Sequence, residues 1–187
     1  MRILALSGSL RADSSNTQLL RFIAQQAPEG VEITLYEELG DLPHFSSDLD
    51  DANSSAVVSA LRQQLQAADG VLICTPEYAF GVPGSLKNAL DWTVSSGELW
   101  HKPTAVISAS PLATGGEKAH ASLLLTLTAL SANVPEGGKL TIPAIKKKLS
   151  AAGDVIDPET ALALKAVLNA LLQTIETAEK NNMDISI

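Results

Sequence analysis

Short apolar runs alternate along this chain with longer segments in which apolar residues recur at helical spacing. The runs predict five strands, at residues 2–7, 31–36, 70–75, 103–109 and 139–142. The first helical stripe consists of Leu20, Ile23, Ala24 and Ala27, before Pro28 and Gly30. Strands that alternate with helices indicate a parallel sheet covered on both faces. At 187 residues, the chain is expected to form a single α/β domain, residues 1–187.

The other helices are marked by their start and stop signals. One is expected to end at Ala68, and two others to begin at Gly84-Ser85 and at Asp157-Pro158. The polar segment 37–53 is long for a connector, which favours a functional loop. Its acids are expected to cap the next helix; they are Asp48, Asp50 and Asp51. Residues 181–187 are expected to be loosely held.

A helix predicted over residues 117–130 is apolar on more than one side. Its main stripe consists of Leu123, Leu124, Leu127 and Leu130, whereas Leu125 points away, and no charged residue occurs from 119 to 135. The helix is too short and too rich in Ser and Thr to span a bilayer. We therefore expect the sheet to cover one side and a second subunit the other, in a homodimer or a dimer of dimers.

Residues 7–17, the first loop, join the first strand to the first helix. The ten residues 8–17 gather four hydroxyls, one carboxamide and the Arg11 guanidinium at a helix N-terminus, where unpaired amides and the helix dipole favour an anion. Neither G-x-x-x-x-G-K-[ST] nor G-x-G-x-x-G is present, so a single phosphate monoester is the favoured guest. The alternative is that Ser14, Ser15 or Asn16 only caps the helix.

Two more loops follow strands of the predicted sheet. The second loop, residues 76–83, is stiffened by two prolines and carries Tyr78 and Phe80; the third, residues 110–116, ends in Gly115-Gly116. The carboxyl ends of parallel strands share one edge, where ligands of such sheets bind, so the three loops are expected to converge there. For the second loop, the alternative is an ordinary connection with a hydrophobic plug.

Composition narrows the classes of partner. A formal net charge of −8 argues against binding to nucleic acid or to an anionic membrane. We interpret Lys146-Lys147-Lys148 as a solvated turn, because no aromatic residue is interleaved with it. The single cysteine, Cys74, lies in an apolar run, which predicts a buried thiol and a reducing cytoplasm. His44 has no His or Cys partner at metal-ligand spacing, so no metal site is predicted.

Together these motifs resemble the NAD(P)H-dependent FMN reductase family of flavodoxin-like proteins, which includes quinone, azo and chromate reductases. The resemblance covers nearly the whole chain. It is carried by Gly8-Ser9-Leu10-Arg11 with Ser14 and Asn16, by Pro76-Glu77-Tyr78, by residues 83–92 and by Gly115-Gly116; Leu42-Pro43-His44-Phe45 with Asp48-Leu49 is a weaker signature. It implies a doubly wound five-stranded parallel sheet of order 2-1-3-4-5.

The resemblance also implies a set of cofactor-binding residues. The FMN phosphate would be held by Ser9, Arg11, Ser14, Ser15, Asn16 and Thr17. The isoalloxazine ring would be bordered by Pro76, Glu77, Tyr78 and Ala79, with Ser110, Gly115 and Gly116 at its other edge. The family usually has Asn where this chain has Ala79, and Gly near Leu112. No catalytic side chain is implied, because the cofactor itself performs the chemistry.

The implied activity is hydride transfer from NADPH or NADH to FMN, followed by transfer to a small acceptor such as a quinone, an azo compound or free flavin. Two alternatives stay open. A flavodoxin-type carrier of single electrons would share the fold, but its phosphate loop resembles T-x-T-G-x-T, which is absent here. A flavin-free regulatory or scaffold protein is the third possibility, suggested by Ala79 and Leu112.

Overall fold

The computed structural model describes residues 1–50 and 55–185 and contains one five-stranded sheet. The strand order is β2-β1-β3-β4-β5 and every pairing is parallel, which confirms the predicted flavodoxin-like sheet. The strands are β1 (Arg2–Ser7), β2 (Glu32–Tyr36), β3 (Gly70–Thr75), β4 (Thr104–Ala109) and β5 (Lys139–Ile142). β2 and β4 begin one residue later than predicted, because the Val31 amide closes a turn on Pro28 and Pro103 has no amide to donate.

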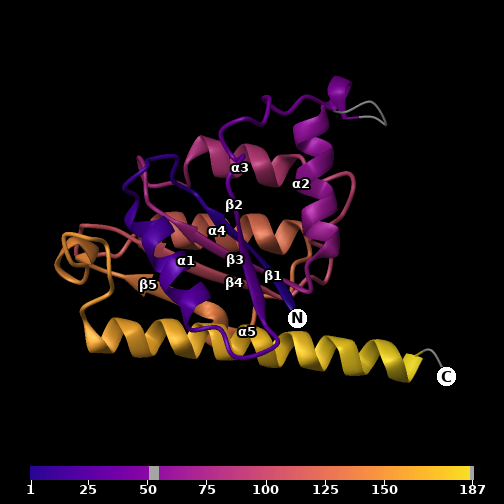
Figure 1. The fold of residues 1–187 in the computed structure, drawn as a ribbon. Helices are drawn as coiled ribbons and strands as arrows, with labels where there is room; N and C mark the ends of the chain where they lie inside the picture. The colour runs from indigo at the N-terminus through magenta and orange to yellow at the C-terminus, as the bar shows by residue number, and fades with distance from the viewer. Residues whose placement is uncertain (51–54, 186–187) are drawn as a thin grey trace.

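Helices cover both faces of the sheet (Figure 1). The α-helices are α1 (Ser15–Gln25), α2 (Ala56–Ala67), α3 (Gly84–Asp91), α4 (Glu117–Ala129) and α5 (Pro158–Ile185), and the 3-10 helices are η1 (Ser47–Leu49), η2 (Glu136–Gly138) and η3 (Ile145–Lys147). α1 and α5 share one apolar core with the sheet, and α2, α3 and α4 share the other. No helix in the described part of the chain is both long and apolar enough to cross a membrane.

The central strands have an apolar residue at nearly every position because both of their faces are covered. All residues of β3 and β4 are buried. On β3, Val71 and Ile73 face the core under α2 to α4, whereas Leu72 and Cys74 face the core under α1 and α5. The burial of Cys74 confirms the interpretation drawn from its apolar run.

Helix starts follow the sequence signals with one correction. Ser14 accepts a hydrogen bond from the Thr17 amide at the start of α1, and Asp157 accepts one from the Thr160 amide at the start of α5. The expectation that acids cap α2 is wrong for Asp48 and Asp50, since Ser55 accepts from the Val58 amide instead. Asp51 lies outside the described residues.

The expectation that residues 181–187 are loosely held can be compared with the structure only as far as residue 185. α5 continues through most of the predicted loose end to Ile185, and residues 186–187 lie outside the described part.

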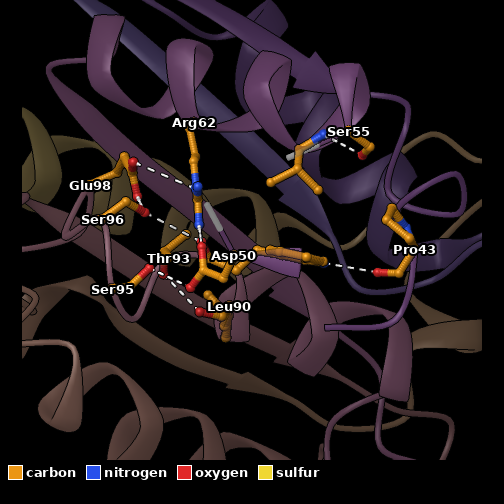
Figure 2. Close-up of polar contacts among 11 residues, drawn as sticks. Pro43, Asp50, Ser55, Arg62, Leu90, Thr93, Ser95, Ser96 and Glu98 are labelled. Carbon is orange, nitrogen blue, oxygen red and sulfur yellow. Dashed lines mark hydrogen bonds and ion pairs between the residues drawn. The ribbon is translucent and has the colours of Figure 1, made fainter. Parts of the chain in front are cut away.

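Asp50 takes part in a polar cluster rather than in a helix cap (Figure 2). Its carboxylate accepts hydrogen bonds from Arg62 Nη2 at 2.6 Å and from Ser95 Oγ at 2.5 Å. Arg62 also donates Nε and Nη2 to the Trp92 carbonyl, at 3.0 and 2.6 Å, and Glu98 lies 4.0 Å away. The Arg62 guanidinium, with help from Ser95, holds the pKa of Asp50 below its usual value. The cluster fastens the end of segment 37–50 to α2 and to the chain after α3.

A second set of contacts fastens the same segment to α3. Asn88 Nδ2 and Trp92 Nε1 both donate to the Pro43 carbonyl, at 2.9 and 2.8 Å. The Phe45 amide donates to Asn88 Oδ1 at 2.8 Å, and the Phe45 ring meets the Trp92 ring edge-on at 5.1 Å between centroids. The weak signature at residues 42–45 and the stronger one at 83–92 are therefore two sides of one contact.

Arg62→Met is expected to lower the free energy of unfolding by about 2–4 kcal/mol at pH 7. The reason is that the Asp50 carboxylate and the Trp92 carbonyl lose the hydrogen bonds that the Arg62 guanidinium donates to them. The pKa of Asp50 is lowered in the folded state, so its stabilisation is present above the unfolded-state value and is lost as pH falls through the folded-state value. The difference between wild type and variant should therefore shrink below about pH 4. Urea unfolding across this pH range measures it.

The control for this prediction is Lys87→Met, which breaks an exposed i, i+4 pair with Asp91. Such a pair is worth less than about 0.5 kcal/mol. Equal losses in the two variants would contradict a structural role for the Asp50 cluster.

Candidate functional site

The three loops meet in one cavity at the carboxyl edge of the sheet. Its lining comes from the first loop (Ser9, Arg11, Ser14, Ser15, Asn16), the second (Pro76, Glu77, Tyr78), the end of β4 with the third (Ala109, Ser110, Pro111) and η3 (Ile145, Lys146). Nine of the thirteen residues implied by the resemblance are thus brought together. The other four, Thr17, Ala79, Gly115 and Gly116, do not line this cavity, and their part in cofactor binding stays a prediction.

The first and second loops are held together where β1 and β3 end. The Gly8 amide donates to the Cys74 carbonyl at 2.8 Å. A Cβ on Gly8 would lie 2.8 Å from Thr75 Oγ1, which is closer than real Cβ atoms come, so only glycine allows this approach. Burial raises the pKa of the Cys74 thiol, which stays protonated and donates to Asn16 Oδ1 at 3.2 Å. The Asn16 carboxamide is thereby oriented with its oxygen inward and its N–H groups unclaimed by the described residues.

The first loop presents donors around the start of α1. Ser9, Ser14 and Asn16 are at most 9% exposed, yet they line the cavity. Ser14 also caps α1, but it does so as an acceptor, so its own O–H remains a donor. No acidic residue occupies the first turn of α1, and the Arg11 side chain forms no ion pair among the described residues. The donor set fits a phosphate monoester.

Thr17 belongs to a neighbouring cavity of about 350 Å³ that shares Ser9 and Arg11 with the first. Its hydroxyl lies 2.8 Å from Ser7 Oγ, so the two hydroxyls bond each other. In the same cavity, the buried Tyr36 hydroxyl has no hydrogen-bond partner among the described residues. Burial, together with Glu38 and Asp41, raises the pKa of Tyr36 to about 12, so the phenol stays neutral.

Glu77 connects the second loop to α4. Its Oε2 accepts hydrogen bonds from the Lys118 and Ala119 amides, both at 2.9 Å. Gly116, the residue before α4, has φ 83° and no side chain to cap the helix, so Glu77 supplies the cap from another loop. Ser108 Oγ donates to the Gly115 carbonyl at 2.9 Å and fixes the third loop. The Glu77 carboxylate is thus largely committed to α4.

The tip of the second loop is a two-residue hairpin. The Tyr78 and Gly81 amides donate to each other's carbonyls at 3.0 and 2.9 Å, and Ala79 and Phe80 between them have φ 48° and 62°. Positive φ at both central residues is typical of a type I′ turn, which favours Asn and Gly. The interpretation as a hydrophobic plug is wrong, because Tyr78 and Phe80 are 51% and 78% exposed.

Lys146 is the functional candidate that the sequence pattern missed. The interpretation of residues 146–148 as a solvated turn does not hold for all three lysines. Lys146 lines the cavity, whereas Lys148 pairs with Asp157 at 3.4 Å and donates to Thr160 at 3.1 Å. Lys146 follows β5, and the carboxyl end of β5 lies at the same sheet edge as the three loops. This position in the sequence could have identified Lys146 as a candidate.

Ala79→Asn is expected to raise the free energy of unfolding of the cofactor-free protein by about 0.5–1 kcal/mol, because Asn tolerates the left-handed conformation better than Ala. Thermal and urea unfolding measure the change. Ala113→Asn, in another exposed loop but without a positive φ, is the control and should give no gain. A loss of stability in Ala79→Asn would argue against the I′ turn.

Comparison with known proteins gives relatives over nearly the full length. The chain is 33% identical over 180 residues to the quinone reductase of Escherichia coli (strain K12), covering 94% of this chain and 96% of the relative. It is 36% identical over 180 residues to the NADPH:quinone oxidoreductase of Arabidopsis thaliana, covering 91% and 90%. The solved structure of FerB, a flavoenzyme NAD(P)H:(acceptor) oxidoreductase from Paracoccus denitrificans, matches with a TM-score of 0.84 at 32% identity, covering 94% and 97%.

A family model agrees with these relatives. The model for NADPH-dependent FMN reductase matches residues 1–147, which include all three loops and all five strands. Sequence, fold and the arrangement of the loops thus point the same way. The chain belongs to the NADPH-dependent FMN reductase family and is an oxidoreductase of that type.

Proposed function

We propose that this protein binds FMN in the cavity of the three loops and passes hydride from NADPH or NADH, through FMN, to a small acceptor such as a quinone, an azo compound or free flavin. The observation that carries the proposal is the first loop, where buried Ser9, Ser14 and Asn16 and the unpaired Arg11 surround the start of a helix whose first turn has no acidic residue. That donor set suits the phosphate of FMN. Family membership supports the redox chemistry.

Each loop has its own role in this proposal. The first loop would hold the phosphate, through Ser9, Arg11, Ser14, Ser15 and Asn16, with Thr17 bracing Ser7 beside it. The second would border the ring through Pro76, Glu77, Tyr78 and Ala79, and the third through Ser110, Gly115 and Gly116. Because Glu77 is bonded to α4, it fixes the second loop rather than moving protons. FMN, when bound, supplies the hydride-accepting and electron-passing chemistry.

The exposed aromatic residues of the second loop would govern access of the acceptor. Tyr78 lines the cavity and is half exposed, and Phe80 stands further out on the same hairpin. Flat aromatic faces at a cavity mouth favour planar acceptors, which suits quinones. Neither ring is required for proton transfer, so no catalytic residue is proposed.

The decisive experiment is anaerobic reduction of the FMN-loaded protein by NADPH or NADH, followed in the visible flavin absorbance. We expect rapid bleaching, and parallel double-reciprocal lines when a quinone acceptor is varied, because both substrates use one site in turn. Tyr78→Phe should change the KM for quinone more than the bleaching rate. Bleaching by a protein reductase but by neither nucleotide would favour the electron carrier, and failure to bind FMN would favour the flavin-free protein.

We further propose that the chain forms a homo-oligomer, a homodimer or a dimer of dimers, through the outer face of α4. Leu125 on this face is 73% exposed. Beside it, a groove of about 430 Å³ runs between the ends of α3 and α4, lined in part by Val94, Trp100 and Leu130. Val94 and Trp100 are more than 60% exposed. Apolar side chains gathered in this way favour a protein partner over solvent.

Leu125→Glu is expected to shift the oligomer to a monomer, because it places a charge in the proposed apolar interface. Light scattering at micromolar concentration measures the mass. Leu162→Glu on α5 is a matched control, since Leu162 is also 73% exposed but lies on a helix of the opposite face. A wild-type mass near 19.6 kDa, the mass of one chain, or equal masses for both variants, would contradict the proposal.

Small molecules, rather than nucleic acid or membrane, are the proposed partners, and the cytoplasm is the proposed location. The net charge of −8 supports small-molecule partners over nucleic acid or membrane. The single buried thiol, Cys74, is in keeping with the cytoplasm.

A further inference from the structure

The three consecutive lysines after β5 occupy three different settings. Lys148 is engaged by Asp157 and Thr160, whereas Lys146 and Lys147 are both exposed and only Lys146 is among the residues that line the cavity. Lys146 lines the cavity of the three loops together with residues of the first loop and with Ser110, whose carbonyl is bonded by the neighbouring Ile145 amide. Among the described residues, Lys146 forms no ion pair. Its charge is therefore available to a ligand.

The backbone under Lys146 is fixed. The Ile145 amide donates to the Ser110 carbonyl at 3.1 Å, and the Ala144 amide donates to the Leu112 carbonyl at 3.1 Å. The Ile145 side chain is 1% exposed and packs in the core under α1 and α5. Ala144 has φ 52°, so the chain turns sharply just before η3. These contacts bind η3 to the third loop and keep Lys146 at the cavity.

Two of the charged residues that line the cavity are free to bind an anion. Three of its lining residues are charged, namely Arg11, Glu77 and Lys146. Glu77 Oε2 is occupied by two amides of α4, which leaves Arg11 and Lys146 as the two uncommitted charges. A phosphate monoester carries about −1.5 to −2 at neutral pH, so one cation alone leaves it partly uncompensated. Both cations therefore line one cavity in a chain whose net charge is −8.

We propose that Lys146 is a second cationic arm of the phosphate site, which closes on the FMN phosphate from η3 while Arg11 binds it from the first loop. This inference rests on the proposed function and deepens it. It assigns to η3 the part of the site that lies outside the three loops. The ammonium acts through the phosphate alone, so Lys146 contributes to the preference for FMN over riboflavin and not to the affinity for the ring.

The test compares Lys146→Gln with Lys147→Gln, two neutralisations one residue apart. Dissociation constants for FMN and for riboflavin are measured by flavin fluorescence with the cofactor-free protein, at low and at high salt. For Lys146→Gln we expect roughly tenfold weaker FMN binding, unchanged riboflavin binding and a smaller salt dependence. Lys147→Gln should bind FMN within about twofold of wild type.

Arg11→Gln and the double variant complete the design. If both cations bind one phosphate, the effects of Arg11→Gln and Lys146→Gln on FMN affinity should be non-additive, and both should leave riboflavin affinity unchanged. Equal FMN affinity of Lys146→Gln and wild type would overturn the inference, as would an equal loss for riboflavin. Failure of wild type to bind FMN would overturn the proposed function itself, which keeps the two outcomes distinct. Thermal unfolding of each cofactor-free variant verifies that the fold is retained.

Discussion

The close approach of β1 and β3 at their carboxyl ends is the constraint on which the site depends. The Gly8 amide bonds the Cys74 carbonyl, and the missing Cβ of Gly8 leaves room for Thr75. That contact places the first loop against the second, and the buried Cys74 thiol then orients Asn16 at the start of α1. Because the sheet is parallel, the third loop and η3 emerge at the same edge. A larger residue at Gly8 would separate the walls that a cofactor must touch together.

Long-range contacts hold the outer parts of this edge. The Pro43 carbonyl and the Phe45 amide bond Asn88 on α3, Trp92 just after α3 also donates to Pro43, and Asp50 is bonded to Arg62 on α2. The long polar segment is thus held at its middle and at Asp50 by contacts with the helices of one face. On the other side of the cavity, η3 is bound to the third loop by two backbone hydrogen bonds. The loops are consequently rigid where ligand groups would be gripped, while the exposed hairpin of Tyr78 and Phe80 stands free at the mouth.

Some charged side chains of this protein have partners within the fold, whereas others are available to a ligand. Glu77 carries a formal charge in the cavity, but its carboxylate is occupied by amides of α4. Arg62 and Lys148 have carboxylate partners in the fold, whereas Arg11 and Lys146 have none among the described residues. An acidic protein can in this way present a locally cationic pocket, which is what binding of a phosphorylated cofactor requires.

The sequence by itself determined the sheet, the helices and the positions of the three loops. Continuous apolar runs mark strands covered on both faces, helical stripes mark the elements that cover them, and hydroxyl- and glycine-rich turns mark the loops, all of which are local patterns. Only the tertiary structure decided the partners of individual side chains. It gave the α2 cap to Ser55 and Asp50 to Arg62, assigned Glu77 to α4, and separated Lys146 from Lys148. The Ser55 cap is local, but Asp50 and Glu77 bond partners 12 to 42 positions away, and the place of Lys146 depends on the packing of η3 against the third loop. A sequence pattern does not show which residues distant in the chain come into contact, because those contacts form only when the helices pack on the sheet.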